Sequence, residues 1–209
     1  MVYLNLRKSF YSVENNASWK FVIVSAIICG CFTGIILNLE SVLIGTSIFN
    51  IGTDFEFWIF AAIIIIMGCD KPLEAGVKTF VFFLISQPLV FFVKAPFSTL
   101  GLGVFKDYKG WFIWTLFTFS GAMIGWNINK KNWLSVIIYM FAVFLLSMEF
   151  GTHFSVFIRN MLYQILSLLF IVVQLIYYGM SFTDKKLRTV FFVLCVLFLT
   201  AGSVIMFDN

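Results

Sequence analysis

Seven apolar stretches of 15 to 21 residues, separated by polar segments, dominate the hydrophobic pattern of the chain. Their lengths approach the roughly 20 residues that a helix needs to cross about 30 Å of hydrocarbon, and they lack the alternating pattern of a membrane β-barrel. The pattern therefore predicts an all-α fold, a polytopic bundle of seven transmembrane helices. The stretches are Phe21–Leu39, Phe55–Cys69, Leu73–Val93, Trp111–Ile128, Trp133–Met148, Asn160–Met180 and Thr189–Phe207.

The segment before the first stretch has a different pattern. Its apolar residues recur at helical spacing on one face: Val2, Leu6, Phe10 and Val13. This spacing is typical of a helix that lies in the membrane interface. We therefore divide the chain into an interfacial N-terminal segment, residues 1–20, and a seven-helix transmembrane domain, residues 21–209.

Lysine and arginine are distributed unevenly over the two sides that seven spans define. With the N-terminus inside, the outer side carries four of them: Lys94, Lys106, Lys109 and Arg159. The inner side carries ten: Arg7, Lys8, Lys20, Lys71, Lys78, Lys130, Lys131, Lys185, Lys186 and Arg188. Because cytoplasmic loops carry the excess of these residues, we expect the N-terminus inside and the C-terminus outside.

The second stretch is the least certain span, since its 15 residues cover only about 22 Å as a helix. Two interpretations remain open. If the helix begins earlier, near Ile48, then Asp54 and Glu56 enter the outer headgroup layer. Alternatively, Ser41–Ile51 forms a surface or re-entrant segment with Gly45 and Gly52 as its breaks.

The composition supports a membrane protein and excludes several other classes. Hydrophobic residues make up 61% of the 209 residues and charged residues only 11%, against about 25% in ordinary soluble domains. A soluble enzyme and a disordered chain are therefore excluded. The net charge of +4 is spread over the loops and forms no basic stripe, so we expect membrane lipids and no nucleic acid as partners.

The sequence offers little for catalysis. The four cysteines lie inside apolar stretches without a CxxC pair, and we interpret them as small hydrophobic residues. The single histidine, His153, falls in the predicted outer loop beside Glu149, where we expect it to contact water. One histidine excludes multi-histidine metal sites. We expect no enzyme, no catalytic residue, no metal and no cofactor.

Two GxxxG motifs predict close helix packing, within the bundle or between protomers. They are Gly30 with Gly34 in the first stretch and Gly121 with Gly125 in the fourth. Small residues at this spacing let helix backbones approach closely.

The centre of the third stretch holds Gln87 and Pro88. Proline removes a backbone hydrogen bond, and a mid-membrane amide needs a polar partner or a water-filled cavity. One interpretation is a kinked helix with an interhelical hydrogen bond and Gln87 facing the protein interior. The other is a broken helix at a solute site, with Ser120 and Gln164 as the candidates nearest in depth.

Before the third stretch lies the most structured polar segment, which contains Asp70, Lys71, Pro72, Glu74 and Lys78. Asp70 is suited to cap the helix, Pro72 to its first turn, and Glu74 to pair with Lys78 four residues later. The structural interpretation is a capped helix with one salt bridge. Because Lys78 lies more than a turn inside the helix, the functional alternative is an anion or lipid-headgroup site at the inner rim.

A resemblance to known proteins rests on three runs. They are Asp70-Lys71-Pro72 through Glu74-Ala75 to Phe80-Val81-Phe82-Phe83-Leu84, then Gly110-Trp111-Phe112-Ile113-Trp114, and then Gly125-Trp126 with Lys130-Lys131. These runs resemble a group of small multi-spanning proteins of low-GC Gram-positive bacteria that has no assigned function. The resemblance implies a multi-pass protein of a bacterial plasma membrane and implies no activity.

Three functions of different classes fit these features. Transport of a small solute, or solute binding by the membrane subunit of a transporter, explains the midplane amide and the central proline. An accessory or immunity-type protein that binds another membrane protein or peptide is the alternative. A membrane-embedded enzyme is the third hypothesis, which the missing catalytic residues disfavour.

Overall fold

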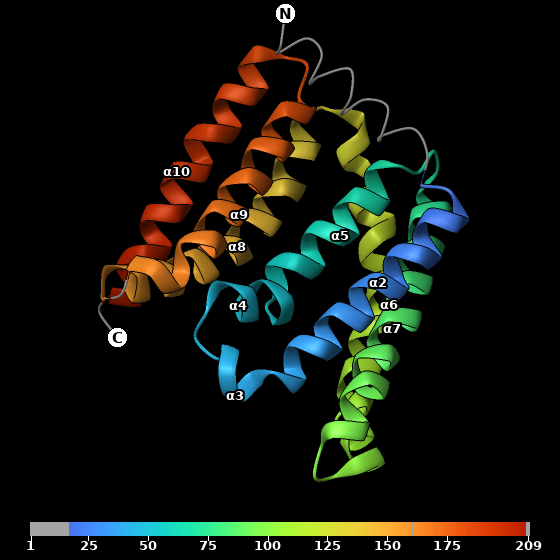
Figure 1. The fold of residues 1–209 in the computed structure, drawn as a ribbon. Helices are drawn as coiled ribbons and strands as arrows, with labels where there is room; N and C mark the ends of the chain where they lie inside the picture. The colour runs from blue at the N-terminus through green and yellow to red at the C-terminus, as the bar shows by residue number, and fades with distance from the viewer. Residues whose placement is uncertain (1–16, 160, 208–209) are drawn as a thin grey trace, which may run out of the picture. The chain divides into compact units, whose positions relative to one another are not determined.

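A computed structural model describes residues 17–159 and 161–207, so most of the predicted interfacial segment lies outside the described residues. The described part is helical and contains no strand, which confirms the all-α class (Figure 1). The α-helices are α2 (Trp19–Asn38), α3 (Glu40–Leu43), α4 (Ser47–Thr53), α5 (Phe55–Met67), α6 (Pro72–Lys94), α7 (Tyr108–Gly125), α8 (Trp133–Arg159), α9 (Met161–Ser181) and α10 (Lys185–Phe207). Short 3-10 helices η1 (Ala95–Phe97), η2 (Gly101–Lys106) and η3 (Trp126–Lys130) connect some of them.

Of the described helices, five are long and apolar enough to cross a membrane: α2, α6 with η1, α8, α9 and α10. The bent pair α4 and α5 makes a sixth span if the two helices count as one. This set indicates an integral, multi-pass membrane protein. The fourth predicted stretch forms α7, which is outside this set, so seven spans and the orientation of the termini stay predictions.

The contacts divide the chain into two units. Unit 1 contains residues up to 38 and residues 61–126, and unit 2 contains residues 39–60 and 127–209. Helix α5 contributes its first half to unit 2 and its second half to unit 1.

Unit 1 is built on α6, against which α2 and α7 pack. Gly30 and Gly34 form the seam between α2 and α6: a Cβ atom on Gly30 would lie 2.5 Å from the Ser86 carbonyl oxygen, and one on Gly34 2.6 Å from the Cβ of Val93. The Asn38 amide also donates to the Val93 carbonyl at 2.9 Å. Small residues therefore set how closely these two helices approach.

Unit 2 is built on α8, α9 and α10, which lie side by side (Figure 1). Gly151 of α8 and Gly202 of α10 leave no room for a Cβ atom, since each faces backbone of the other helix. Farther along, Tyr139 and Tyr178 stack with ring centroids 5.2 Å apart, and both side chains are fully buried. This aromatic core holds the three helices together.

The segment between α2 and α5 has features of both interpretations of the second span. Gly45 breaks the chain with φ of +81°, a conformation that favours glycine, and α4 then begins at Ser47. The break expected at Gly52 is absent from the described structure, because Gly52 lies inside α4. The helix does extend back from Phe55, but it bends by 51° at Asp54.

Three hydrogen bonds fix α4 on α9. The Ser47 hydroxyl donates to the Tyr163 carbonyl at 2.7 Å and accepts from the Leu166 amide at 3.2 Å, while the Ser167 hydroxyl donates to the Ser47 carbonyl at 3.4 Å. The short helix α4 is thereby positioned beside the N-terminal end of α9.

Candidate functional site

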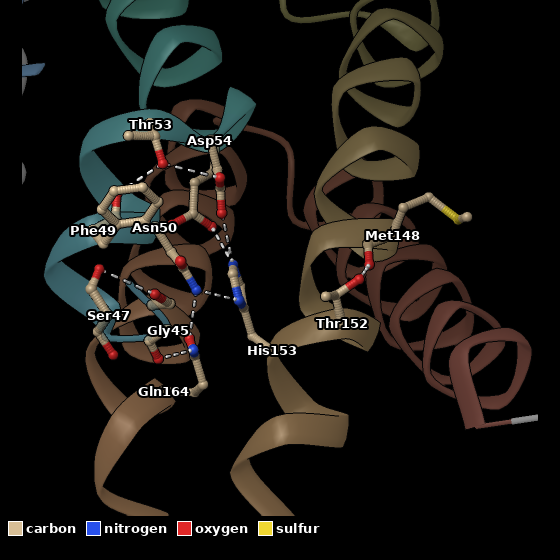
Figure 2. Close-up of polar contacts among 12 residues, drawn as sticks. Gly45, Ser47, Phe49, Asn50, Thr53, Asp54, Met148, Thr152, His153 and Gln164 are labelled. Carbon is tan, nitrogen blue, oxygen red and sulfur yellow. Dashed lines mark hydrogen bonds and ion pairs between the residues drawn. The ribbon is translucent and has the colours of Figure 1, made fainter. Parts of the chain in front are cut away.

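The bend between α4 and α5 brings together four ionisable side chains of unit 2, which we call the break cluster: Asp54, Glu56, Glu149 and His153. Asp54 occupies the bend, Glu56 lies in the first turn of α5, and Glu149 and His153 lie one turn apart on α8. His153 Nε2 lies 3.6 Å from Asp54 Oδ2 and 3.7 Å from Glu56 Oε2. Figure 2 shows the His153 ring pointing from α8 toward Asp54.

Burial distinguishes the members of the cluster. The Glu56 side chain is 0% exposed and His153 is 2% exposed, whereas Asp54 keeps 28% of its side-chain surface. Within the part of the chain that the structure describes, neither carboxylate oxygen of Glu56 has a hydrogen-bond partner, and neither does His153 Nε2. A buried charge without a hydrogen-bond partner destabilises the folded state. A proton or another cation bound at this site would compensate for that loss.

The other ring nitrogen of His153 is held by a chain of amides. Asn50 Nδ2 lies 3.2 Å from His153 Nδ1 and donates to Gln164 Oε1 at 2.9 Å. Gln164 Nε2 in turn donates to the Gly45 carbonyl at 2.8 Å. This amide chain links the Gly45 carbonyl before α4 to Gln164 on α9, then to Asn50 on α4, and finally to His153 on α8 (Figure 2).

The cluster has the chemistry of a cation or proton site. Ligand atoms of Asp54, Glu149 and His153 all lie within 4.8 Å of one another, a spacing at which they could hold a metal ion after small movements. Carboxylate and imidazole groups also exchange protons in the physiological range when their surroundings shift them. The arrangement therefore suits a positively charged ligand.

The position of His153 corrects a prediction from the sequence. The residues after Met148 were expected to form an outer loop with a water-exposed histidine, but α8 continues to Arg159 and buries His153. The reason is physical: the polar groups of Asn50 and Asp54 face the ring, so that a polar stretch of helix is accommodated without solvent.

The predicted solute-site residues have different surroundings. Gln164 is buried in unit 2 and belongs to the amide chain. Gln87 is 5% exposed on α6 of unit 1, as expected for a residue that faces the interior, and α6 continues through Pro88 without a break. Ser120 is exposed on α7 and donates to the Phe117 carbonyl of its own helix. Of the two interpretations of Pro88, the broken helix is therefore wrong; the break is at Asp54.

The predicted inner-rim residues form a local structure at the start of α6. Lys71, not Asp70, is the N-cap residue, and no side-chain hydrogen bond caps this end in the described structure. Instead Glu74 accepts from the Asp70 amide at 3.1 Å and from the Lys78 ammonium. The Lys78 side chain is 8% exposed and lies over the Trp19 ring at 5.8 Å. Lys78 is thus buried and paired.

The second GxxxG motif differs from the first. A Cβ atom on Gly121 would meet nothing within 4 Å among the described residues, and one on Gly125 would meet only the end of Ile66 at 3.3 Å. Within the described residues of unit 1, Gly121 therefore forms no close helix seam.

Reasoning from the sequence missed the cluster as a site. The i,i+4 spacing of Glu149 and His153 was a usable signal, since such residues share one helix face. Asp54 and Glu56 were recognised as polar residues beside the second span. The contact of α5 with α8 joins segments about 100 residues apart, as with Asn50 and His153, which are 103 residues apart. A single sequence does not reveal such a pairing.

Comparison with known proteins gives no family: no protein-family model, no curated protein and no solved structure matches the chain. The residues of the site therefore provide the evidence for function.

Proposed function

We propose that the chain is a membrane transport protein for a small solute, or the solute-binding membrane subunit of one. In this proposal the break cluster binds the cation on which transport depends. The cation is either the coupling ion or the solute itself.

The observation that carries the proposal is the Glu56 carboxylate, which is fully buried and lacks a hydrogen-bond partner in the described part of the chain. Burying such a group costs several kcal/mol or more, and folding alone would select an apolar residue at this position. Ionisable residues retained inside membrane helices mark ion and substrate pathways.

The bend at Asp54 supports the same proposal. Secondary transporters commonly bind their solutes and coupling ions at discontinuous helices, because the ends of the two helix halves present polar backbone groups and dipoles to the ligand. Here α4 and α5 meet at 51°, and three carboxyl groups gather at that bend. A ligand with positive charge is the one that this arrangement favours.

Ligand-induced stabilisation of the purified full chain tests the proposal. A ligand that binds only the folded state raises the melting temperature, because it stabilises that state by RT ln(1 + L/Kd), where L is the free ligand concentration. The probes are Na⁺, Mn²⁺, methylammonium and protons, the last supplied as a pH series between about pH 5 and pH 8. We expect at least one probe to stabilise the wild-type protein in lipid nanodiscs.

Two variants give the experiment its specificity. Glu56→Gln keeps the shape of the side chain and removes its charge, so it should abolish the stabilisation. Glu40→Gln is the matched control, because Glu40 also belongs to unit 2 but is exposed on α3. Wild-type protein and Glu56→Gln that respond identically to all four probes would refute the proposal.

A further inference from the structure

We propose that the amide chain from Gly45 to His153 fixes the histidine as a neutral Nε2–H donor, and that the cation of the break cluster is therefore a proton and not a metal ion. This inference rests on the proposed function and names the cation. It assigns Asn50 and Gln164 as positioning residues, because they act on the ligand through His153.

The direction of the hydrogen bonds in the amide chain follows from the end of that chain at the Gly45 carbonyl. A carbonyl oxygen can only accept hydrogen bonds, so the Gln164 atom 2.8 Å from the Gly45 oxygen is the amide nitrogen. Gln164 Oε1 is then an acceptor, and it takes one hydrogen of Asn50 Nδ2 at 2.9 Å. The second hydrogen of Asn50 Nδ2 points to His153 Nδ1 at 3.2 Å.

This direction determines where the imidazole carries its proton. His153 Nδ1 faces an N–H group, so this nitrogen presents its lone pair. A neutral imidazole carries one proton, which must then lie on Nε2. His153 therefore presents an N–H donor to the carboxyl groups of Asp54 and Glu56.

A metal ion at Nε2 would require the opposite tautomer. Nε2 would supply its lone pair to the metal, and the proton would move to Nδ1, where it would face the Asn50 N–H group. Turning both amides around would remove that conflict only by placing Gln164 Oε1 against the Gly45 carbonyl oxygen, at the 2.8 Å now occupied by a hydrogen bond. Two acceptors at this distance repel each other. The amide chain therefore disfavours both metal binding at His153 Nε2 and a His153 imidazolium.

A proton meets no such conflict. It passes from a hydronium ion to one carboxylate oxygen of Glu56: an O–H bond forms on Glu56, one breaks in the hydronium ion, and water leaves. The transfer removes the charge that burial penalises. The Nε2–H group of His153 lies 3.7 Å from Glu56 Oε2 and faces the carboxyl group in both states. The other titratable groups of the cluster are Asp54 and Glu149, while α9 contributes the uncharged Gln164. Their negative charge favours proton uptake.

Nitrogen-15 NMR of histidine-labelled protein in nanodiscs tests the tautomer directly. The chain contains a single histidine, so both imidazole resonances belong to His153. We expect a protonated Nε2 and an unprotonated Nδ1 between about pH 6 and pH 8. Added Zn²⁺ should leave both resonances unchanged in the wild-type protein.

Asn50→Asp reverses the polarity at Nδ1, because a carboxylate accepts where the amide donated. This variant should move the proton to Nδ1, free Nε2 and bind Zn²⁺ at least about tenfold more tightly than the wild-type protein. Asn132→Asp is the matched control, since it adds the same charge in unit 2, and its Oδ1 can still accept from the Ser135 amide. The control should keep the wild-type tautomer and Zn²⁺ affinity.

The outcomes separate this inference from the proposed function. A wild-type protein with the proton on Nδ1, or one whose His153 binds Zn²⁺ as tightly as Asn50→Asp does, would overturn the inference while leaving cation binding by the cluster intact. An Nε2–H tautomer together with no effect of Glu56→Gln on any probe would instead overturn the proposed function. If Asn50→Asp does not fold, the wild-type spectrum alone decides the tautomer.

Discussion

Each unit of the protein buries a long charged side chain, Lys78 in unit 1 and Glu56 in unit 2, and the two have different surroundings. Lys78 of unit 1 is 8% exposed, pairs with Glu74 one turn earlier and lies over Trp19. Glu56 of unit 2 is 0% exposed and, among the described residues, has no hydrogen bond to either carboxylate oxygen. The first burial is compensated by neighbours and is explained by structure. The second is not compensated, and a charge kept at such cost points to a ligand.

The largest expected loss of stability follows from breaking the amide chain. Gln164→Leu leaves the Gly45 carbonyl and the Asn50 amide without their partner, and each unsatisfied group costs roughly 1–3 kcal/mol. We expect unfolding in mixed micelles to show a loss of about 3 kcal/mol.

Gln174→Leu is the comparison on the same helix. Gln174 is equally buried but accepts one hydrogen bond, from Tyr178 at 3.1 Å, and its Nε2 lacks a partner within the described structure. Its loss should be the smaller of the two. A larger loss for Gln174→Leu than for Gln164→Leu would contradict the role given to the amide chain.

The second-largest loss of stability is expected in unit 1. Glu74→Gln leaves the buried Lys78 ammonium without its carboxylate, which in a fully buried pair costs roughly 3–5 kcal/mol. Because Glu74 itself is 34% exposed, solvent screens part of the interaction within the pair, and we expect a loss of stability of about 1–2 kcal/mol. Equal stability of Glu74→Gln and wild-type protein would show that Lys78 does not depend on this pair.

Removing Lys78, the other partner of this pair, should lower the stability less than removing Glu74. Lys78→Met takes away the buried charge and leaves a partly exposed carboxylate that water can solvate, so we expect a change below about 1 kcal/mol. If Lys78 instead holds a lipid phosphate or a substrate anion, the same variant would abolish activity while Glu74→Gln would not. Transport and unfolding assays of both variants separate these two roles.

The smallest change in stability should come from Glu56, the residue to which we assign cation binding in the proposed function. Glu56→Gln removes a buried carboxylate that no described neighbour compensates, so the free energy of unfolding should stay constant or rise by about 1 kcal/mol. A clear loss of stability in this variant would mean that Glu56 has a structural partner. The comparison between the two units would then fail.

The sequence predicted the helical class because long apolar stretches have few alternatives in a membrane. It also predicted the Glu74–Lys78 pair, since four residues on one helix determine their own proximity. A broken helix at Pro88 was one of the two interpretations, but α6 passes through this proline, as membrane helices often do when neighbouring groups satisfy the freed carbonyl. The actual break depends on Gly45, Asp54 and the contacts of α4 with α9, which are tertiary.

The end of α8 shows why the site itself was less predictable. Glu149 and His153 interrupt an apolar stretch, which is the usual sign that a membrane helix has ended. The helix continues because Asp54 and Asn50, about 100 positions earlier, contact the His153 ring. Polarity alone does not distinguish the end of a span from the wall of a buried site.

Infrared difference spectroscopy is the most direct test of the claim that Glu56 binds the proton. A pH jump on the full chain in a lipid film reports the C=O stretch of a carboxyl group as it gains or loses its proton. We expect a buried-carboxyl band in the wild-type protein and in Glu40→Gln that is absent in Glu56→Gln. A band that persists in Glu56→Gln, or a wild-type protein without one, would show that Glu56 does not bind the proton.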